Sequence, residues 1–126
     1  MTKSEMLENT TLELRRGVIV MAVLSQLGKE QYGYSLLKLL SDQGLELDQG
    51  TLYPLLRRLE SQGLLQSVWR LEEARPRRYY VISEAGREML PRLKEEWTKI
   101  MSMMEKMLKA DPLGRPNASG KGRENL

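Results

Sequence analysis

The sequence predicts a mainly α-helical fold with a small β hairpin, and three observations support that fold class. Apolar residues recur at helical spacing in three successive segments between residues 11 and 63. Residues 64–82 change to two runs of strand-forming residues on either side of a polar turn. Beyond residue 83 the apolar residues return to spacings of three and four, which is typical of a long helix that packs along one side.

The composition excludes several classes of protein. The 126 residues are enough for one domain with an appended helix or tail. Because the chain contains no Cys and no His, we exclude thiolate zinc sites and Cys nucleophiles, and we expect no catalytic residue, metal or cofactor. The chain has no run of about 18 apolar residues, and its first ten residues lack the apolar segment of a signal peptide. We therefore expect a cytoplasmic protein with no membrane association.

Both ends of the chain are polar. Residues 1–10 show no apolar period, so we expect a flexible N-terminal tail there. Residues 111–126 are rich in Pro, Gly, Ser and Asn, which predicts a disordered C-terminal tail. The organised part of the chain is then a domain over residues 11–82 and a helix over residues 83–110.

Three helices are predicted between the N-terminal tail and the hairpin. The first covers residues 11–27 and ends at Gly28, a favoured residue just beyond a helix C-cap. The second starts near Tyr32 and ends before Gly44. The third has Asp48 as its N-cap and ends at Gly63. Its apolar stripe follows the spacing i, i+3, i+4, i+7: Leu52, Leu55, Leu56 and Leu59.

The hairpin and the last helix complete the predicted fold. The polar residues 72–76 separate the two strand-forming runs, and side-chain alternation requires one of Tyr79 and Tyr80 to point into the core. Ser83 is placed to cap the last helix. Two prolines, Pro54 and Pro91, lie inside predicted helices, where a proline costs about 3 kcal/mol. We expect Pro91 to bend the last helix early in its course.

The order of three helices, a hairpin and a further helix is that of a winged helix-turn-helix domain followed by a long C-terminal dimerisation helix. The third helix buries its leucine stripe, so its opposite face is free to enter the major groove of DNA, which admits one helix. Small residues near its start allow close approach to phosphates, and arginines can bind phosphate or guanine bidentately. The predicted DNA-binding residues on this helix are Gln49, Gly50, Thr51, Tyr53, Pro54, Arg57 and Arg58.

The hairpin adds basic residues next to that helix. Between residues 57 and 78 the chain has six arginines and three glutamates, although the net charge of the whole chain is only +3. Arginines of a wing commonly contact phosphates or a narrow minor groove. We therefore predict DNA contacts from Arg75, Arg77 and Arg78. The alternative is a solvated basic face or a set of intrachain ion pairs of little energetic value.

The last helix carries an apolar seam of the coiled-coil type. Its members alternate by three and four residues: Leu90, Leu93, Trp97, Ile100, Met104 and Met107. The simplest partner for this seam is a second copy of the chain, and a twofold dimer predicts a pseudo-palindromic operator in double-stranded DNA. Trp97, Met101 and Met104 could also hold a flat aromatic effector between protomers. The alternative is that these three side chains only fill the dimer core.

Two stretches of the sequence closely resemble the PadR-type transcriptional regulators. They are the segment GTLYPLLRRLE at residues 50–60, with YGYSLL upstream of it, and RRYY at residues 77–80. The resemblance spans about residues 12–108. It implies a bacterial winged-helix repressor that dimerises through its C-terminal helix, with DNA contacts from the helix of Tyr53 and Arg57 and from the wing near Arg77. A single C-terminal helix resembles the smaller branch of that family.

In some members of that branch, the resemblance further implies, a tryptophan of this helix lines a pore at the dimer interface and stacks flat aromatic drugs. Trp97 lies at the matching place, whereas Pro91 departs from the usual pattern of that helix. The sequence thus predicts a homodimeric repressor that binds DNA and is released by a small effector. Two other functions are weighed against it. A winged-helix adaptor would bind proteins and not DNA, and an enzyme would have to work without His or Cys.

Overall fold

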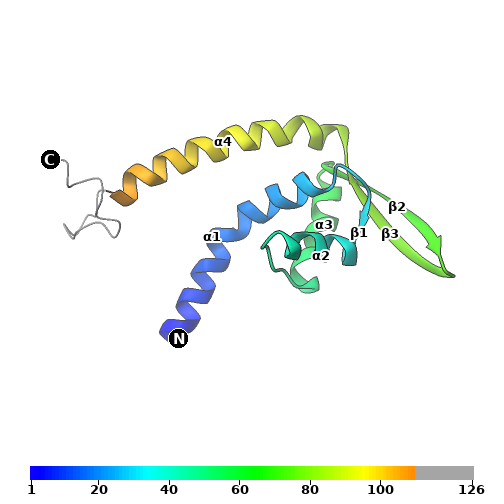
Figure 1. Ribbon diagram of the computed structural model, residues 1–126, viewed down its shortest axis with the longest axis horizontal. Helices are drawn as coiled ribbons and strands as arrows, with labels where there is room; N and C mark the ends of the chain where they lie inside the picture. Colours follow the sequence, from blue (N-terminus) through cyan, green and yellow to red (C-terminus); the bar gives the residue numbers. More distant parts are fainter. Residues whose placement is uncertain (110–126) are drawn as a thin grey trace. The chain divides into compact units, whose positions relative to one another are not determined.

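The computed structural model describes residues 1–109, which form four helices and a three-stranded antiparallel sheet (Figure 1). The predicted mainly α-helical fold with a small β hairpin, a winged helix-turn-helix with a long C-terminal helix, is confirmed. Residues 1–91 form one compact unit, and the rest of the last helix, from Arg92, belongs to a second. In chain order the elements are α1 (Lys3–Gln26), β1 (Gln31–Tyr32), α2 (Gly33–Asp42), α3 (Gln49–Ser61), β2 (Leu65–Glu72), β3 (Arg75–Ile82) and α4 (Glu84–Lys109).

Helix α1 begins at Lys3, so the predicted flexible tail over residues 1–10 is wrong. A capping box starts this helix: the Thr2 hydroxyl accepts a hydrogen bond from the Glu5 backbone N–H at 3.1 Å, and the Glu5 carboxylate accepts one from the Thr2 N–H at 3.3 Å. The N-terminal half of α1 continues beyond α2 and α3 in Figure 1. The other predicted tail, over residues 111–126, lies outside the described residues.

The core of the first unit is made by one face of each of its first three helices. The leucine stripe predicted for α3 is buried as expected, with Leu52 fully covered. Burial of one such side chain stabilises the fold by about 1.5–3 kcal/mol. The side chains that are less than 2% exposed come from α1, α2, α3 and the residue after α1: Val23, Leu24, Leu27, Leu36, Leu52, Leu56 and Leu59.

The start of α3 is fixed by a cap. The Asp48 carboxylate accepts a hydrogen bond from the Thr51 backbone N–H at 2.8 Å, as predicted for an N-cap. Hydrogen bonds from Thr51 lower the pKa of Asp48 below its usual value of 3.8. Pro54 lies inside α3 and is exposed. Its missing N–H would have bonded to the carbonyl of Gly50, close to the helix start, so only one early hydrogen bond is lost.

The wing is a tighter hairpin than the sequence predicted. Strands β2 and β3 pair from Leu65 opposite Ile82 to Glu72 opposite Arg75. Only Glu73 and Ala74 form the turn, and both have positive φ, 51° and 61°, as the favoured two-residue hairpin turn requires. The sequence instead predicts a longer turn over residues 72–76. Strand β1, which the sequence did not predict, adds a third strand beside β3, giving the order β1-β3-β2.

Helix α4 starts against the base of the wing. The Ser83 hydroxyl accepts a hydrogen bond from the Gly86 N–H at 3.0 Å, as predicted for a cap, and donates one to the carbonyl of Gly63 at 2.6 Å. A Cβ at Gly86 would lie 2.4 Å from the Leu64 carbonyl oxygen. Only glycine therefore allows this close approach. The helix is continuous through Pro91. Over residues 1–109, no helix has the length and apolar character needed to span a bilayer.

Candidate nucleic-acid interface

The face of α3 opposite the buried leucines is open to solvent. Six of its seven predicted DNA-binding residues are exposed, and Tyr53 is half-buried. The helix start is accessible, since the nearest atom to a Cβ at Gly50 would be the Asp48 carboxylate oxygen at 3.7 Å. The exposed residues of this face, in order, are Gln49, Gly50, Thr51, Pro54, Arg57 and Arg58.

The half-buried Tyr53 is held by close packing between α2 and α3. A Cβ on Gly33, the first residue of α2, would lie 2.4 Å from Cε1 of Tyr53 and 3.0 Å from its hydroxyl oxygen. The glycine of the sequence YGY therefore makes room for the tyrosine ring. Tyr53 is consequently oriented by the helix-turn-helix itself, and its ring lies beside Arg57 on the wall of a crevice described below.

Arg57 and Arg58 are the free cations of α3. Within residues 1–109 neither guanidinium makes an ion pair or a side-chain hydrogen bond, and both are exposed. Arginines in this state carry unneutralised charge and unused N–H donors, which suit a phosphate or a guanine edge.

The three predicted wing arginines differ in their surroundings. The side chain of Arg75, next to the turn, is exposed and unpaired within the part of the chain that the structure describes. Arg77 lies over the Tyr32 ring at 4.5 Å from its centroid and pairs with Glu72 at 3.4 Å. Glu72 also accepts a hydrogen bond from the Tyr79 hydroxyl at 2.6 Å, which raises the pKa of Tyr79. The stack on Tyr32 fixes the direction of Arg77 at one face of the wing.

Arg78 faces the other side of the wing and is paired. Its Nη2 lies 2.5 Å from a carboxylate oxygen of Glu60, the penultimate residue of α3, and its Nε donates to the Ser67 hydroxyl at 3.1 Å. Sequence reasoning grouped Arg78 with Arg75 and Arg77 and missed both partners. It also missed the pairing of Arg70 with Glu30, whose two hydrogen bonds measure 3.0 and 2.9 Å.

A crevice of about 260 Å³ separates α3 from the wing. Its walls are aromatic and its polar groups are arginines, so it is an apolar hollow bordered by positive charge. The lining residues that the sequence did not single out for DNA binding include Tyr32 and Trp69, from β1 and β2. The remaining lining residues include Tyr53, Arg57, Arg77, Arg78 and the buried Tyr80, whose pKa is raised by burial.

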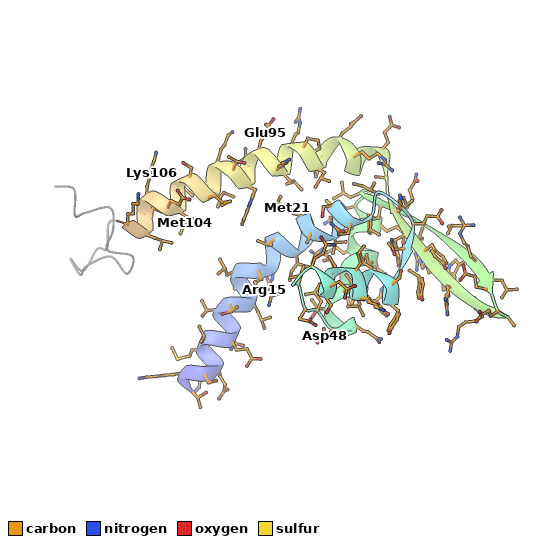
Figure 2. All side chains as sticks on the ribbon, in the orientation of Figure 1. Arg15, Met21, Asp48, Glu95, Met104 and Lys106 are labelled. Atoms are coloured by element: carbon orange, nitrogen blue, oxygen red, sulfur yellow. The ribbon has the colours of Figure 1, made fainter. Side chains whose placement is uncertain are left out.

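The apolar seam predicted on α4 is exposed from Trp97 onward. Trp97 is 37% exposed and Met107 57% exposed, and Ile100, Met101 and Met104 lie between these values. Figure 2 shows Met104 on one side of α4 and Glu95 and Lys106 on the other, as expected for an amphipathic helix. Leu90 and Leu93 are half-buried.

Helix α1 adds a second exposed apolar set that the sequence did not indicate. Its members lie on the N-terminal half of α1, part of which the sequence predicts to be a tail: Met6, Leu7, Leu12 and Leu14.

Comparisons with known proteins agree on one group of relatives. The model of the transcriptional regulator PadR-like family matches residues 20–92. Transcriptional regulator Rv3488 of Mycobacterium tuberculosis is 39% identical over 79 residues, which cover 62% of this chain and 74% of that protein. A PadR family transcriptional regulator from Eggerthella lenta has a similar structure, with a TM-score of 0.79 and 42% identity, over 86% of this chain and 96% of that one. A PadR family transcription regulator from Clostridium difficile superimposes with a TM-score of 0.64 at 31% identity, over 71% and 97% of the two chains.

Proposed function

Because the chain belongs to the PadR-like family of transcriptional regulators, we propose that it represses transcription by binding double-stranded DNA as a homodimer at a pseudo-palindromic operator. One observation supports DNA binding most strongly. The exposed face of α3 carries Arg57 and Arg58, neither of which has a carboxylate partner within residues 1–109. Both guanidinium groups are solvated in the free protein, so each can neutralise a phosphate and release a counterion without first breaking an ion pair.

In this proposal α3 is the recognition helix. Its N-terminal residues Gln49, Gly50 and Thr51 approach a phosphate, where the positive end of the helix dipole favours negative charge. Because the Asp48 cap already accepts from the Thr51 N–H, the donors to the phosphate are the N–H groups of Gln49 and Gly50 and the Thr51 hydroxyl. Arg57 and Arg58 lie about two turns further along and reach base edges or the opposite phosphates. Tyr53 and Pro54 complete the surface that contacts the groove.

The wing contacts the DNA backbone beside the groove. Arg75 is exposed at its tip and unpaired within residues 1–109, so it can meet a phosphate directly. Arg77 is stacked on Tyr32 and lies 3.4 Å from Glu72, and it would exchange this single longer pair for a phosphate.

Dimerisation is proposed to occur along α4. The seam of Leu90, Leu93, Trp97, Ile100, Met104 and Met107 is the surface that a second copy would bury. The exposed leucines and methionine of the N-terminal half of α1 offer further apolar area to the same dimer. A twofold dimer carries two copies of α3, and half-sites about 34–36 Å apart satisfy both.

An effector is proposed at the same interface. Trp97, Met101 and Met104 share one exposed face of α4, so two protomers would enclose a flat aromatic molecule between their tryptophans. Bound ligand would change the angle between the two wings and release the operator. In the Trp69→Phe variant, Trp97 is the single tryptophan, since the chain has two. Quenching of its fluorescence by a planar dye such as acridine, together with weaker operator binding, supports the effector site. If the dye changes neither the Trp97 fluorescence nor the operator affinity, Trp97 only packs in the dimer core and the effector site is contradicted.

The test of DNA binding begins with selection of a duplex from a random pool. Binding of the selected duplex, followed by fluorescence anisotropy, should weaken steeply as salt is added, because displaced phosphate counterions contribute to affinity. Arg57→Ala should weaken binding by ~1–3 kcal/mol if the guanidinium reads a base. If no duplex is enriched and binding at low salt is negligible, the chain is an adaptor that uses its winged domain for protein contacts.

A further inference from the structure

We propose that Arg78 is a positioning residue. Together with Glu60 and Ser67 it forms a polar junction that fixes the wing relative to the recognition helix, and it does not itself contact DNA. This inference assigns a role within the proposed function and rests on it for the effect on DNA affinity. The junction itself can be tested without DNA.

The three side chains of the junction come from three different elements. Glu60 lies near the end of α3, Ser67 on β2 and Arg78 on β3. Arg78 Nη2 lies 2.5 Å from Glu60 Oε1, and Arg78 Nε donates to Ser67 Oγ at 3.1 Å. The Ser67 hydroxyl donates in turn to Glu60 Oε2. Each of the two carboxylate oxygens therefore has a donor, and the guanidinium uses its Nε edge in a closed triangle of hydrogen bonds.

The alternation of β3 places Arg78 on the inner face of the wing. Tyr80 and Ile82, two and four residues further along, are 6% and 4% exposed, so this face of the strand is the one that covers the core. Arg75 and Arg77 occupy the opposite face. In the sequence RRYY, the two arginines consequently point in opposite directions, although they are adjacent in the chain.

Aromatic rings complete the surroundings of the Arg78 guanidinium. Its central carbon lies 5.3 Å from the centroid of the Tyr80 ring and 5.8 Å from that of the Trp69 ring. The side chain retains 34% of its exposure, and Glu60 retains 27%. To reach a phosphate, the Arg78 guanidinium would have to leave Glu60. The Glu60 carboxylate would then lie near the DNA with no cation to neutralise it.

The junction matters for binding because the recognition helix and the wing must engage one duplex at the same time. The groove and the neighbouring phosphates are at fixed separations, so a wing that moves relative to α3 loses contacts even when every contacting residue is present. Arg78 thus acts through the placement of Arg75 and Arg77. Loss of the junction should weaken binding without removing a phosphate contact.

The first experiment measures the junction in the free protein. Unfolding of the full chain in urea is followed for Glu60→Gln, Arg78→Met and the double variant. If the two side chains interact directly, the double variant should lose less stability than the sum of the two single losses. The unfolding equilibrium constant of the double variant should be about fivefold smaller than additive effects would give. Additive losses would overturn the junction. If Arg78→Met folds poorly, Ser67→Ala takes its place in the cycle with Glu60→Gln, since the Ser67 hydroxyl donates to the same carboxylate.

The second experiment uses the duplex selected for the wild type. Arg78→Met should lower affinity about tenfold at every salt concentration and leave the slope of log affinity against log salt unchanged, whereas Arg75→Met, the matched control on the same strand, should reduce that slope by about one. A loss of slope for Arg78→Met equal to that for Arg75→Met would overturn the proposal.

The sign of the Glu60→Gln effect on DNA affinity separates the two roles of Arg78. If Arg78 bound phosphate, removal of a neighbouring negative charge would free the guanidinium and tighten binding. A positioning role predicts weaker binding, although Glu60→Gln removes one negative charge and so raises the net charge of the chain. Tighter binding of Glu60→Gln therefore contradicts the proposal. If the wild type binds no duplex, the proposed function fails, and the urea measurements still confirm or overturn the junction.

Discussion

Replacement of Gly86 by alanine tests whether the start of α4 is packed against the base of the wing as described. The added Cβ would lie 2.4 Å from the Leu64 carbonyl oxygen and 2.6 Å from Ile82 Cγ1, whereas non-bonded carbon atoms rest at about 3.5–4.0 Å. The backbone or the Ile82 side chain must therefore move by roughly 1 Å. The Leu64 carbonyl cannot move freely, because it accepts a hydrogen bond from the Ser83 N–H at 3.0 Å.

The net effect of Gly86→Ala follows from three contributions. Overpacking of this kind costs about 1–3 kcal/mol, and a weakened hydrogen bond adds about 0.5–1.5 kcal/mol. Alanine is the better helix former by about 1 kcal/mol, which offsets part of the loss. We therefore expect the free energy of unfolding to fall by about 1–3 kcal/mol, and Tm by at least about 4 °C.

Urea unfolding followed by circular dichroism measures this change, at one protomer concentration for all variants, since a dimer links stability to concentration. The midpoint should fall with an unchanged slope. Gly17→Ala is the matched control: Gly17 lies within α1 and a Cβ there would have nothing within 4 Å, so roughly 0.5–1 kcal/mol of stability should be gained. If Gly86→Ala is as stable as the wild type or more stable, the close packing inferred at this position is incorrect.

Three further predictions concern the core, the α3 cap and the helix-turn-helix. Leu52→Ala, at a fully buried position, should lower the free energy of unfolding by about 2–5 kcal/mol in urea, and an unchanged midpoint would contradict the described core. Because the pKa of Asp48 is lowered in the folded protein, the stabilising effect of its carboxylate is present above the unfolded pKa and disappears as pH falls through the folded pKa. Between about pH 5 and pH 2, Asp48→Asn should therefore lose less stability than the wild type, as measured by acid titration of the unfolding midpoint. An equal loss in the two proteins would refute the assignment of Asp48 as the cap. Gly33→Ala should displace the Tyr53 ring and weaken binding of the selected duplex, whereas the same substitution added to Tyr53→Ala should have little further effect; additive effects would show that the two residues act separately.

The sequence predicted those parts of the fold whose signal lies within one element. The leucine stripe and the Asp48 cap of α3 are local patterns, and both are present in the structure. The start of α1 was missed although its signal was also local. The segment Thr2-Lys3-Ser4-Glu5 is a capping box, and it was overlooked because the residues that follow have no regular apolar period.

Features that depend on distant residues were harder to predict. Strand β1 has two residues, too few for any alternation, and exists because β3 offers it an edge. The partner of Arg78 is Glu60, 18 residues earlier in the chain, so composition alone could not separate a paired arginine from a free one. Side-chain alternation along β3 did carry that information: once Tyr80 faces the core, Arg78 must share its face.

Sedimentation velocity of the full chain with its selected duplex tests most directly whether two chains bind one operator through α3. The proposed function predicts a complex of two chains per duplex at micromolar concentration, which dissociates as salt is raised and fails to form with the Arg57→Ala, Arg58→Ala double variant. A complex with one chain per duplex, or a double variant that binds as tightly as the wild type, would contradict it.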